Sequence, residues 1–248
     1  MTGPVLESGV LEIGLIYPTV LGTYGDSGNA LVLAERARRR GFGARVVPVE
    51  IGEPVPASLD IYTLGGGEDT AQALAAEHLR AGAGGMVAAQ GAGAPVLAIC
   101  ASMQILGTEY TDAAGRRVGG LGLLDIVTTP RGSRAIGELI EAPLLEGLTG
   151  LLTGFENHGG GTCLGPDAEP FGRVLAGVGN ACATDGEGPW YEGAVQGSVI
   201  GTYMHGPVLA RNPQLADLIL SRVLGPLEPL EVPWVEALRG ERLAEVPG

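Results

Sequence analysis

The stretch Val96-Leu-Ala-Ile-Cys100-Ala-Ser-Met-Gln104 decides the expected fold. Its first four residues form an apolar run that predicts a buried strand, and the residues after Cys100 predict a helix that begins at once. A cysteine at this junction would lie at the carboxyl end of a parallel strand, where open α/β sheets place their ligand sites. The first amides of the helix would stabilise a thiolate and donate to an oxyanion. A buried, unreactive cysteine is the alternative that this segment leaves open.

On either side of this stretch, apolar runs alternate with helical patterns. The runs at 11–17, 44–49, 59–64 and 95–99 predict strands. A helix is expected after Asp26 or Ser27, either of which can cap it, and another from about 68 to 86. Strands that are apolar throughout and separated by helices are typical of a parallel sheet covered on both faces. We therefore expect a three-layer α/β/α fold around a mostly parallel central sheet.

Beyond Arg117 the pattern changes to short β-like runs separated by Gly, Asn and Asp. These runs lie at 123–128, 135–141, 150–156, 173–176, 192–196 and 199–203. Helices are expected at about 208–223 and 234–242. The predicted organisation is an N-terminal tail (1–10), one α/β domain (11–225) and a C-terminal extension (226–248), which we expect to be helical.

The composition excludes several kinds of function. The 248 residues contain 15 Arg and no Lys against 28 Asp and Glu, for a net charge of −13. Binding to nucleic acid or to an anionic membrane needs a basic face, which this balance does not favour. The absence of Lys excludes Schiff-base chemistry and a Walker-type phosphate-binding Lys. Although 43 residues are Gly and 17 are Pro, the 45% hydrophobic content indicates a folded, globular chain.

We expect a cytoplasmic location. The sequence has no apolar run of 18 residues, and residues 1–10 lack the basic and apolar regions of a secretory signal. The three cysteines (Cys100, Cys163 and Cys182) are odd in number and lack the spacing of a disulfide framework, which indicates a reducing compartment. His158 and Cys163 are too few ligands for a structural zinc site, so we expect no metal.

A nucleophilic cysteine needs a base, and the chain has three histidines. His205 follows the apolar run Val199-Ile-Gly-Thr-Tyr-Met204, so it is expected at the same edge of the sheet as Cys100. His158 lies in a Gly-rich segment and is a weaker candidate. His78 lies within a helical pattern and is expected to be a partly exposed surface residue. The sequence therefore favours His205 as the base.

The segment Ala98-Ile-Cys-Ala-Ser-Met-Gln104 resembles the nucleophile segment, G-x-C-x-G-x-Q, of triad-type glutamine amidotransferases. Ala98 and Ser102 replace the two flanking glycines of that pattern. Further segments resemble the family of glutaminase (GatD-type) subunits of lipid II isoglutaminyl synthase, in the cobyric-acid-synthase-like branch. They are 24–29, 65–69 with Gln72, 120–125, 154–160 and 201–207 with 212–213, and the resemblance runs from about residue 13 to residue 217.

This resemblance implies the class I glutamine amidotransferase (flavodoxin-like) fold and the hydrolysis of glutamine through a cysteine thioester. It also implies a heterodimer with a Mur-ligase-like (MurT-type) partner. The partner would use the ammonia and ATP to convert the D-glutamate of lipid II, a peptidoglycan precursor, to D-isoglutamine. No cofactor is expected in this chain, since ATP and Mg²⁺ would bind to the partner.

Roles for individual residues follow. Cys100 is the expected nucleophile and His205 the general base that later protonates ammonia. The N–H of Ala101 and one from the loop at Gly66 and Gly67 are the expected oxyanion donors, since both lie at strand ends beside Cys100. By position, Arg134 matches the family's substrate-binding Arg, with Arg131 as the near alternative. Gln104 is expected to contact glutamine as well.

The third catalytic group is left open by the sequence. The common amidotransferase pattern has a Glu two residues after the His, and here that position is Pro207. Either another carboxylate orients the imidazole or the partner supplies one. Without an orienting acid the imidazole adopts the wrong tautomer part of the time, so weak hydrolysis by the isolated chain is expected.

Three other interpretations stay open at this stage. The chain could be a cobyrinic-acid-type amidotransferase component, although those enzymes normally carry their synthetase domain in the same chain. It could be a cysteine hydrolase or chaperone of the same sheet type, which would act alone and would not need Arg134. It could also be a catalytically silent scaffold for a ligase, for which the substitutions at Ala98, Ser102 and Pro207 are the support.

Overall fold

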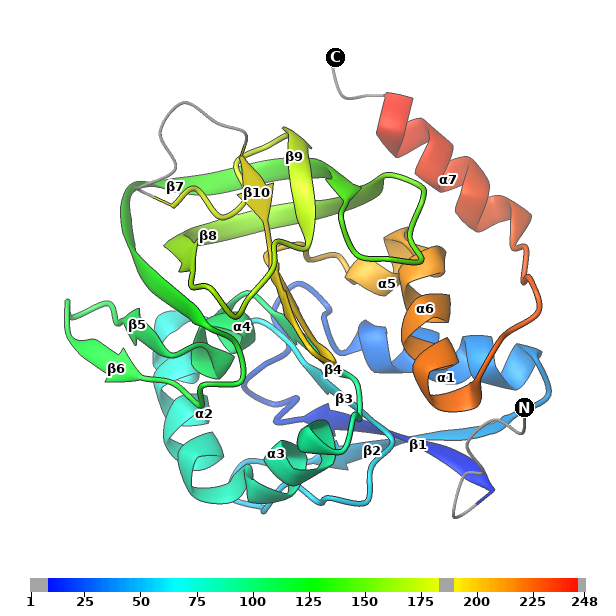
Figure 1. Ribbon diagram of the computed structural model, residues 1–248, viewed down its shortest axis with the longest axis horizontal. Helices are drawn as coiled ribbons and strands as arrows, with labels where there is room; N and C mark the ends of the chain where they lie inside the picture. Colours follow the sequence, from blue (N-terminus) through cyan, green and yellow to red (C-terminus); the bar gives the residue numbers. More distant parts are fainter. Residues whose placement is uncertain (1–8, 183–189, 245–248) are drawn as a thin grey trace.

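The computed structural model describes residues 9–182 and 190–244 and contains a central six-stranded sheet (Figure 1). The strand order is β11-β12-β4-β3-β1-β2, and every pairing is parallel except that of β11 with β12. This confirms the mostly parallel sheet. The strands are β1 (Val10–Ile16), β2 (Gly43–Val49), β3 (Ile61–Leu64), β4 (Val96–Ile99), β11 (Ala194–Gln196) and β12 (Val199–Thr202).

Helices cover both faces of this sheet. Figure 1 shows α1, α5 and α6 on one side and α2 and α3 on the other. The covering helices are α1 (Gly28–Arg39), α2 (Asp69–Gly82), α3 (Gly84–Gly91), α4 (Ala101–Leu106), α5 (Val208–Arg211) and α6 (Pro213–Leu224). All residues of β3, β4 and β12 are buried, as expected for strands with helices on both faces.

A second sheet was not predicted. Its order is β10-β9-β7-β5-β6, and β8 also pairs with β7; the pairings are antiparallel except β5 with β7. Its strands are β5 (Glu109–Thr111), β6 (Arg117–Gly119), β7 (Ile126–Pro143), β8 (Leu152–Leu164), β9 (Gly172–Ala176) and β10 (Tyr191–Glu192). In Figure 1, β7, β8 and β9 lie above the central sheet.

Three of the predicted β-like runs are joined or divided differently in the structure. Residues 126–128 of the first run and all of the run at 135–141 belong to the single strand β7, because the polar segment between them continues the strand with a register shift between Pro130 and Ala135. The run at 192–196 is two strands in different sheets. Gly193, at φ +64°, turns the chain between β10 and β11, a conformation that glycine adopts readily.

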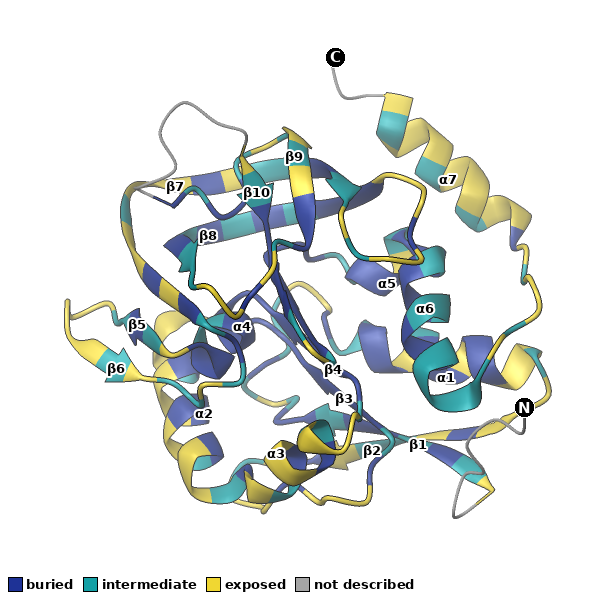
Figure 2. Cartoon of the chain, viewed as in Figure 1, coloured by how far each residue is buried: buried dark blue, intermediate teal, exposed yellow. Residues whose placement is uncertain are grey.

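The C-terminal helices also differ in detail from the prediction. The helix expected at 208–223 is interrupted at Asn212, whose side chain bonds the backbone N–H and C=O of Thr153 instead of continuing the helix. Pro213 then begins α6. The terminal helix expected at 234–242 is present as α7 (Pro233–Ala244), and none of its residues is buried (Figure 2). Among the described residues, no helix has the length and apolarity to cross a membrane.

Candidate active site

Cys100 lies at the junction of β4 and α4, as its sequence context predicted. Its backbone adopts φ 51° and ψ −107°, a conformation that is unfavourable for a residue with a Cβ and that recurs at functional turns. The hydroxyl of Ser102 donates to the carbonyl of Gly65, which ties the start of α4 to the Gly-rich loop after β3. Ser102, a departure from the family's glycine, therefore contributes a hydrogen bond that glycine cannot make.

His205 lies three residues after β12, at the same edge of the sheet. Its backbone N–H and C=O bond to Phe155 of β8 at 2.8 and 3.2 Å, so the two sheets meet at this residue. A Cβ added to Gly66 would lie 2.6 Å from His205 Cε1 and 3.5 Å from Cys100 Cβ. This close approach brings His205, Cys100 and the Gly-rich loop together, and the absence of a side chain at Gly66 permits it.

Asp26 has a different role from the helix cap that the sequence predicted. It was one of two residues, with Ser27, that could cap α1, but no side-chain hydrogen bond caps that helix. Instead, Asp26 Oδ2 accepts hydrogen bonds from His205 Nδ1 and from the Gly66 N–H, both at 2.8 Å. The carboxylate thus orients the imidazole, which is the first of the two alternatives left open by Pro207. Pro207 itself packs its ring against Gly28, at the start of α1.

The charge state of His205 follows from these neighbours. Burial alone lowers the pKa of the imidazole. The hydrogen bond that His205 donates to Asp26, the interactions with Cys100 and the negative charge of Asp26 outweigh burial and raise the pKa of His205 to about 10. At neutral pH, His205 therefore carries a proton. A cationic imidazole stabilises the thiolate form of a neighbouring cysteine.

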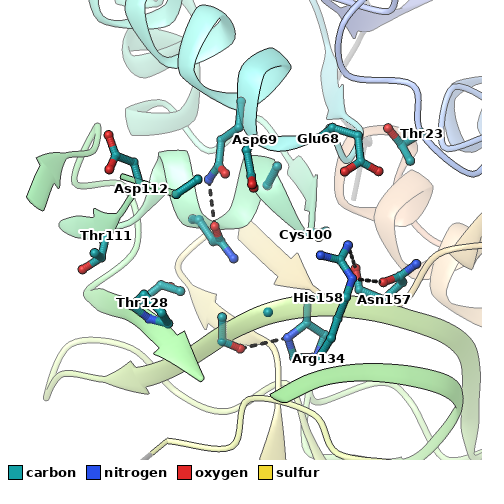
Figure 3. A pocket seen from close by; sticks show the side chains of 18 of the residues that line it. Thr23, Glu68, Asp69, Cys100, Thr111, Asp112, Thr128, Arg134, Asn157 and His158 are labelled. Carbon is teal, nitrogen blue, oxygen red and sulfur yellow. Dashed lines mark hydrogen bonds between the residues drawn. The ribbon is translucent and has the colours of Figure 1, made fainter. Parts of the chain in front are cut away.

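These residues open onto a pocket of about 200 Å³. Figure 3 shows side chains that line it, with Cys100, Asp69, Asp112, Arg134 and His158 among those labelled. Gln104 also lines the pocket. Its Oε1 accepts from Gln72 Nε2 at 2.7 Å and its Nε2 donates to Tyr203 Oη at 3.1 Å, so the side-chain amide is held at both ends. These two bonds fix the orientation of the Gln104 amide in the pocket wall.

Of the two candidate arginines, the structure places Arg134 in the pocket lining and not Arg131. Arg134 Nε donates to Asn157 Oδ1, and Nη2 donates to the Asn157 carbonyl at 3.4 Å. No carboxylate pairs with Arg134 within residues 9–182 and 190–244. The guanidinium is exposed and positively charged, as an anchor for an anionic ligand must be.

The expected oxyanion donors are only partly in place. The Gly66 N–H is already bonded to Asp26, so it does not point to a ligand. Gly67 and Ala101 both line the pocket with Cys100. Ala101 is the first residue of α4, where a backbone N–H has no acceptor within the helix.

His158 has a different environment from the one expected. It lies in β8, 2% exposed, with Nε2 at 3.2 Å from Glu156 Oε2 and its ring stacked on Tyr203 at 3.6 Å. It lines the pocket, but its two ring nitrogens are hydrogen-bonded to the Gly160 carbonyl and to Glu156. His78 lies in α2 and is partly exposed, as predicted.

Cys163 and Cys182, expected to be unpaired, form a disulfide with their Cα atoms 4.8 Å apart. The sequence did not predict this pair because three cysteines cannot all pair, and the unpaired one is Cys100. Cys163 is therefore not a metal ligand. In the described parts of the chain, no group of three or more His, Cys, Asp and Glu side chains is arranged to hold a metal ion.

Comparison with known proteins places this site in a family. Residues 12–213 match the CobB/CobQ-like glutamine amidotransferase domain. The chain belongs to this family. It is 35% identical over 218 residues to the lipid II isoglutaminyl synthase (glutamine-hydrolyzing) subunit GatD of Staphylococcus aureus (strain N315), covering 86% of this chain and 85% of that protein. The GatD subunit of Streptococcus pneumoniae (strain ATCC BAA-255 / R6) is 34% identical, covering 95% of this chain and 89% of that protein.

More distant relatives agree on the fold. The cobyric acid synthase of Sphingopyxis alaskensis (strain DSM 13593 / LMG 18877 / RB2256) is 33% identical over 73% of this chain, but the match spans only 35% of that longer protein. A crystal structure of a glutamine amidotransferase superimposes with a TM-score of 0.56 at 20% identity, covering 85% of this chain and 98% of the other. The fold is therefore that of the class I glutamine amidotransferases, as predicted.

Proposed function

We propose that this chain hydrolyses glutamine through a thioester on Cys100 and delivers the ammonia to a Mur-ligase-like (MurT-type) partner. The partner would amidate the α-carboxyl of D-glutamate in lipid II to give D-isoglutamine, and would bind the ATP and Mg²⁺ that this step needs. The reaction would take place in the cytoplasm, where glutamine and ATP are available. The observation that carries the proposal is that Cys100 and His205 line one pocket and that Asp26 is hydrogen-bonded to His205.

The proposed chemistry begins with attack of the Cys100 sulfur on the side-chain amide carbon of glutamine. A tetrahedral intermediate forms, and the N–H groups of Gly67 and Ala101 would bind its oxyanion; one such donor contributes about 3 kcal/mol. The C–N bond then breaks, and His205 gives its proton to the leaving nitrogen, which departs as ammonia. A γ-glutamyl thioester remains on Cys100.

Water completes the cycle. His205, now neutral, takes a proton from a water molecule whose oxygen attacks the thioester carbon. The C–S bond breaks, glutamate leaves, and the thiolate and the protonated imidazole are restored. Asp26 acts throughout by holding Nδ1, so that Nε2 serves both proton transfers. Arg134 would bind the α-carboxylate of glutamine and Gln104 would contact the bound substrate.

The choice of acceptor rests on the relatives. The two GatD subunits match this chain over 85% and 89% of their lengths, whereas the cobyric acid synthase matches over 35% of its length. We therefore favour lipid II over a cobyrinic acid as the acceptor.

The test combines the chain with the Mur-ligase-like subunit of the same organism, ATP, lipid II and glutamine labelled with ¹⁵N at the side-chain amide. Labelled amidated lipid II is the expected product by mass analysis. Cys100→Ser should abolish labelling from glutamine, while added ammonium salt should restore amidation, because only the ammonia source is lost. Amidation of a cobyrinic acid in place of lipid II would refute the acceptor, and unchanged labelling in Cys100→Ser would refute the thioester.

A further inference from the structure

Asn157 occupies the part of Arg134 that a carboxylate would bind. Arg134 Nε donates to Asn157 Oδ1 and Nη2 donates to the Asn157 carbonyl (Figure 3). This Nε–Nη2 edge is a surface through which guanidinium groups bind carboxylates with two parallel hydrogen bonds. We propose that Asn157 is a specificity-determining residue that competes with the substrate's carboxylate for Arg134 and so sets the affinity for glutamine. The inference rests on the proposed function, in which Arg134 anchors glutamine.

The competition is unequal in charge. Asn157 offers neutral oxygens, whereas a substrate carboxylate offers charged ones, and charge-assisted hydrogen bonds are about twice as strong. Both Arg134 and Asn157 line the pocket that contains Cys100, so the exchange takes place where substrate binds. A carboxylate can therefore displace Asn157, but it gains less free energy than it would from an unoccupied guanidinium. The result is a weaker apparent affinity for glutamine than Arg134 alone would give.

Asn157 is held in this position from the other side by Tyr24. Asn157 Nδ2 donates to the Tyr24 hydroxyl, and the Tyr24 ring packs edge-on against His205 with 4.9 Å between centroids. Tyr24 has φ +58°, a left-handed conformation that costs about 1–2 kcal/mol in a residue with a side chain. The fold maintains this strain, and it fixes the hydroxyl where the Asn157 amide can bind it. Asn157 is thus oriented with its oxygen toward Arg134.

Two substitutions at Asn157 should change the KM for glutamine in opposite directions. The KM is measured from glutamate release by the full-length chain. Asn157→Ala removes the side-chain oxygen that competes for Arg134 Nε and keeps only the weaker 3.4 Å bond from Nη2 to the backbone carbonyl, so the KM for glutamine should fall about threefold to tenfold. Asn157→Asp places a charged competitor on Arg134, so the KM should rise about tenfold. The kcat should change little in either variant. Ser133→Asp adds the same charge beside Arg134 in sequence but outside the pocket lining, and should leave the KM within about twofold.

A second substrate separates this role from a structural one. The amide 4-aminobutanamide is glutamine without its α-carboxylate, so it cannot compete for Arg134. Its KM, or its inhibition constant if turnover is too slow, should be the same in wild type, Asn157→Ala and Asn157→Asp. Tyr24→Phe, which removes only the hydroxyl that orients Asn157, should lower the KM for glutamine in the same direction as Asn157→Ala.

A rise of the glutamine KM in both Asn157 variants would overturn the inference, and so would equal shifts for the two substrates. Either result would leave the proposed function intact, since wild-type hydrolysis of glutamine is measured in the same assay. If the wild-type chain hydrolyses no glutamine, alone or with the ligase subunit, the proposed function fails and this inference fails with it.

Discussion

Asp26 and His205 are 179 residues apart in the chain, yet the carboxylate of one accepts a hydrogen bond from the imidazole of the other at 2.8 Å. Both side chains are almost completely buried, with exposures of 2% and 1%. The bond fixes which ring nitrogen faces the carboxylate and leaves Nε2 for proton transfer. The group that orients the imidazole is thus part of this chain.

The isolated chain should therefore hydrolyse glutamine without a ligase subunit. The expectation of only weak hydrolysis rested on the lack of an orienting acid at Pro207, and Asp26 provides a carboxylate bonded to the imidazole. Glutamate release by the purified chain, measured with and without the ligase subunit, tests this prediction, with Cys100→Ser as the inactive control. If hydrolysis requires the ligase subunit, the Asp26 carboxylate is not sufficient to orient His205 for catalysis.

Asp26→Asn should lower kcat by up to about 10⁴-fold, the loss found when the acid of a catalytic triad becomes an amide. The alkaline side of the pH profile should also change. His205 needs its proton to release ammonia, and the Asp26 charge helps to raise the pKa of His205 to about 10. Without that charge, activity should decline at a lower pH than in the wild type.

The dependence of kcat/KM on pH measures how far the alkaline limit of activity moves in Asp26→Asn. Asp167→Asn is a suitable control, because Asp167 is exposed and lies away from the pocket. A profile in Asp26→Asn that keeps its alkaline limit would show that another group holds the proton on His205.

The sequence predicted the elements that carry local signals. Apolar strands gave β1 to β4 and β12, and the positions of Cys100 and His205 at strand ends placed them at one edge of the sheet. Parallel strands bring their carboxyl ends together whatever their separation in sequence, so this juxtaposition could be derived without coordinates.

The role of Asp26 and the second sheet could not be derived in that way. An Asp before a helix predicts a helix cap, because capping involves only neighbouring residues. A pairing with a histidine 179 residues away leaves no such local signal in the sequence. The second sheet consists of strands interrupted by glycine and polar residues, and its long strand β7 crosses a segment that reads as a loop. The disulfide likewise depends on how β8 meets a distant loop, which residue spacing does not encode.

Glu141 and Glu192 form a buried pair of carboxyl groups beneath the strand that leads to His205. Glu192 accepts from the Tyr203 N–H at 2.6 Å and from the Thr202 hydroxyl, whereas Glu141 lies against Gly172 and accepts no hydrogen bond from a described donor. Burial raises the pKa of Glu192 to about 7. Burial and the charge of Glu192 raise the pKa of Glu141 well above its usual value.

Glu141→Gln should therefore stabilise the protein at alkaline pH. Because folding raises these pKa values, the folded state keeps protons that the unfolded state loses above about pH 4.5, so stability falls as pH rises from there through pH 7 and beyond. The amide removes one of the two titrating groups, so the variant should exceed the wild type by about 1 kcal/mol or more at pH 8. Urea unfolding at pH 5 and pH 8 measures the difference, with the exposed Glu146→Gln as control. A variant that is less stable than wild type at pH 8 would argue that Glu141 is charged and satisfied.

Reduction of the Cys163–Cys182 disulfide should lower stability by about 3 kcal/mol, as expected for a bond that closes a loop with a sequence separation of 19 residues. The bond joins the end of β8 to the loop after β9, where the Thr162 N–H also donates to the Asn180 carbonyl at 2.9 Å. Thermal unfolding with and without a phosphine reductant measures the effect. The double variant Cys163→Ser/Cys182→Ser should unfold at the temperature of the reduced wild type and should not respond to the reductant. Thiol titration of the denatured, unreduced protein should find one free thiol, from Cys100; three would show that the disulfide does not form.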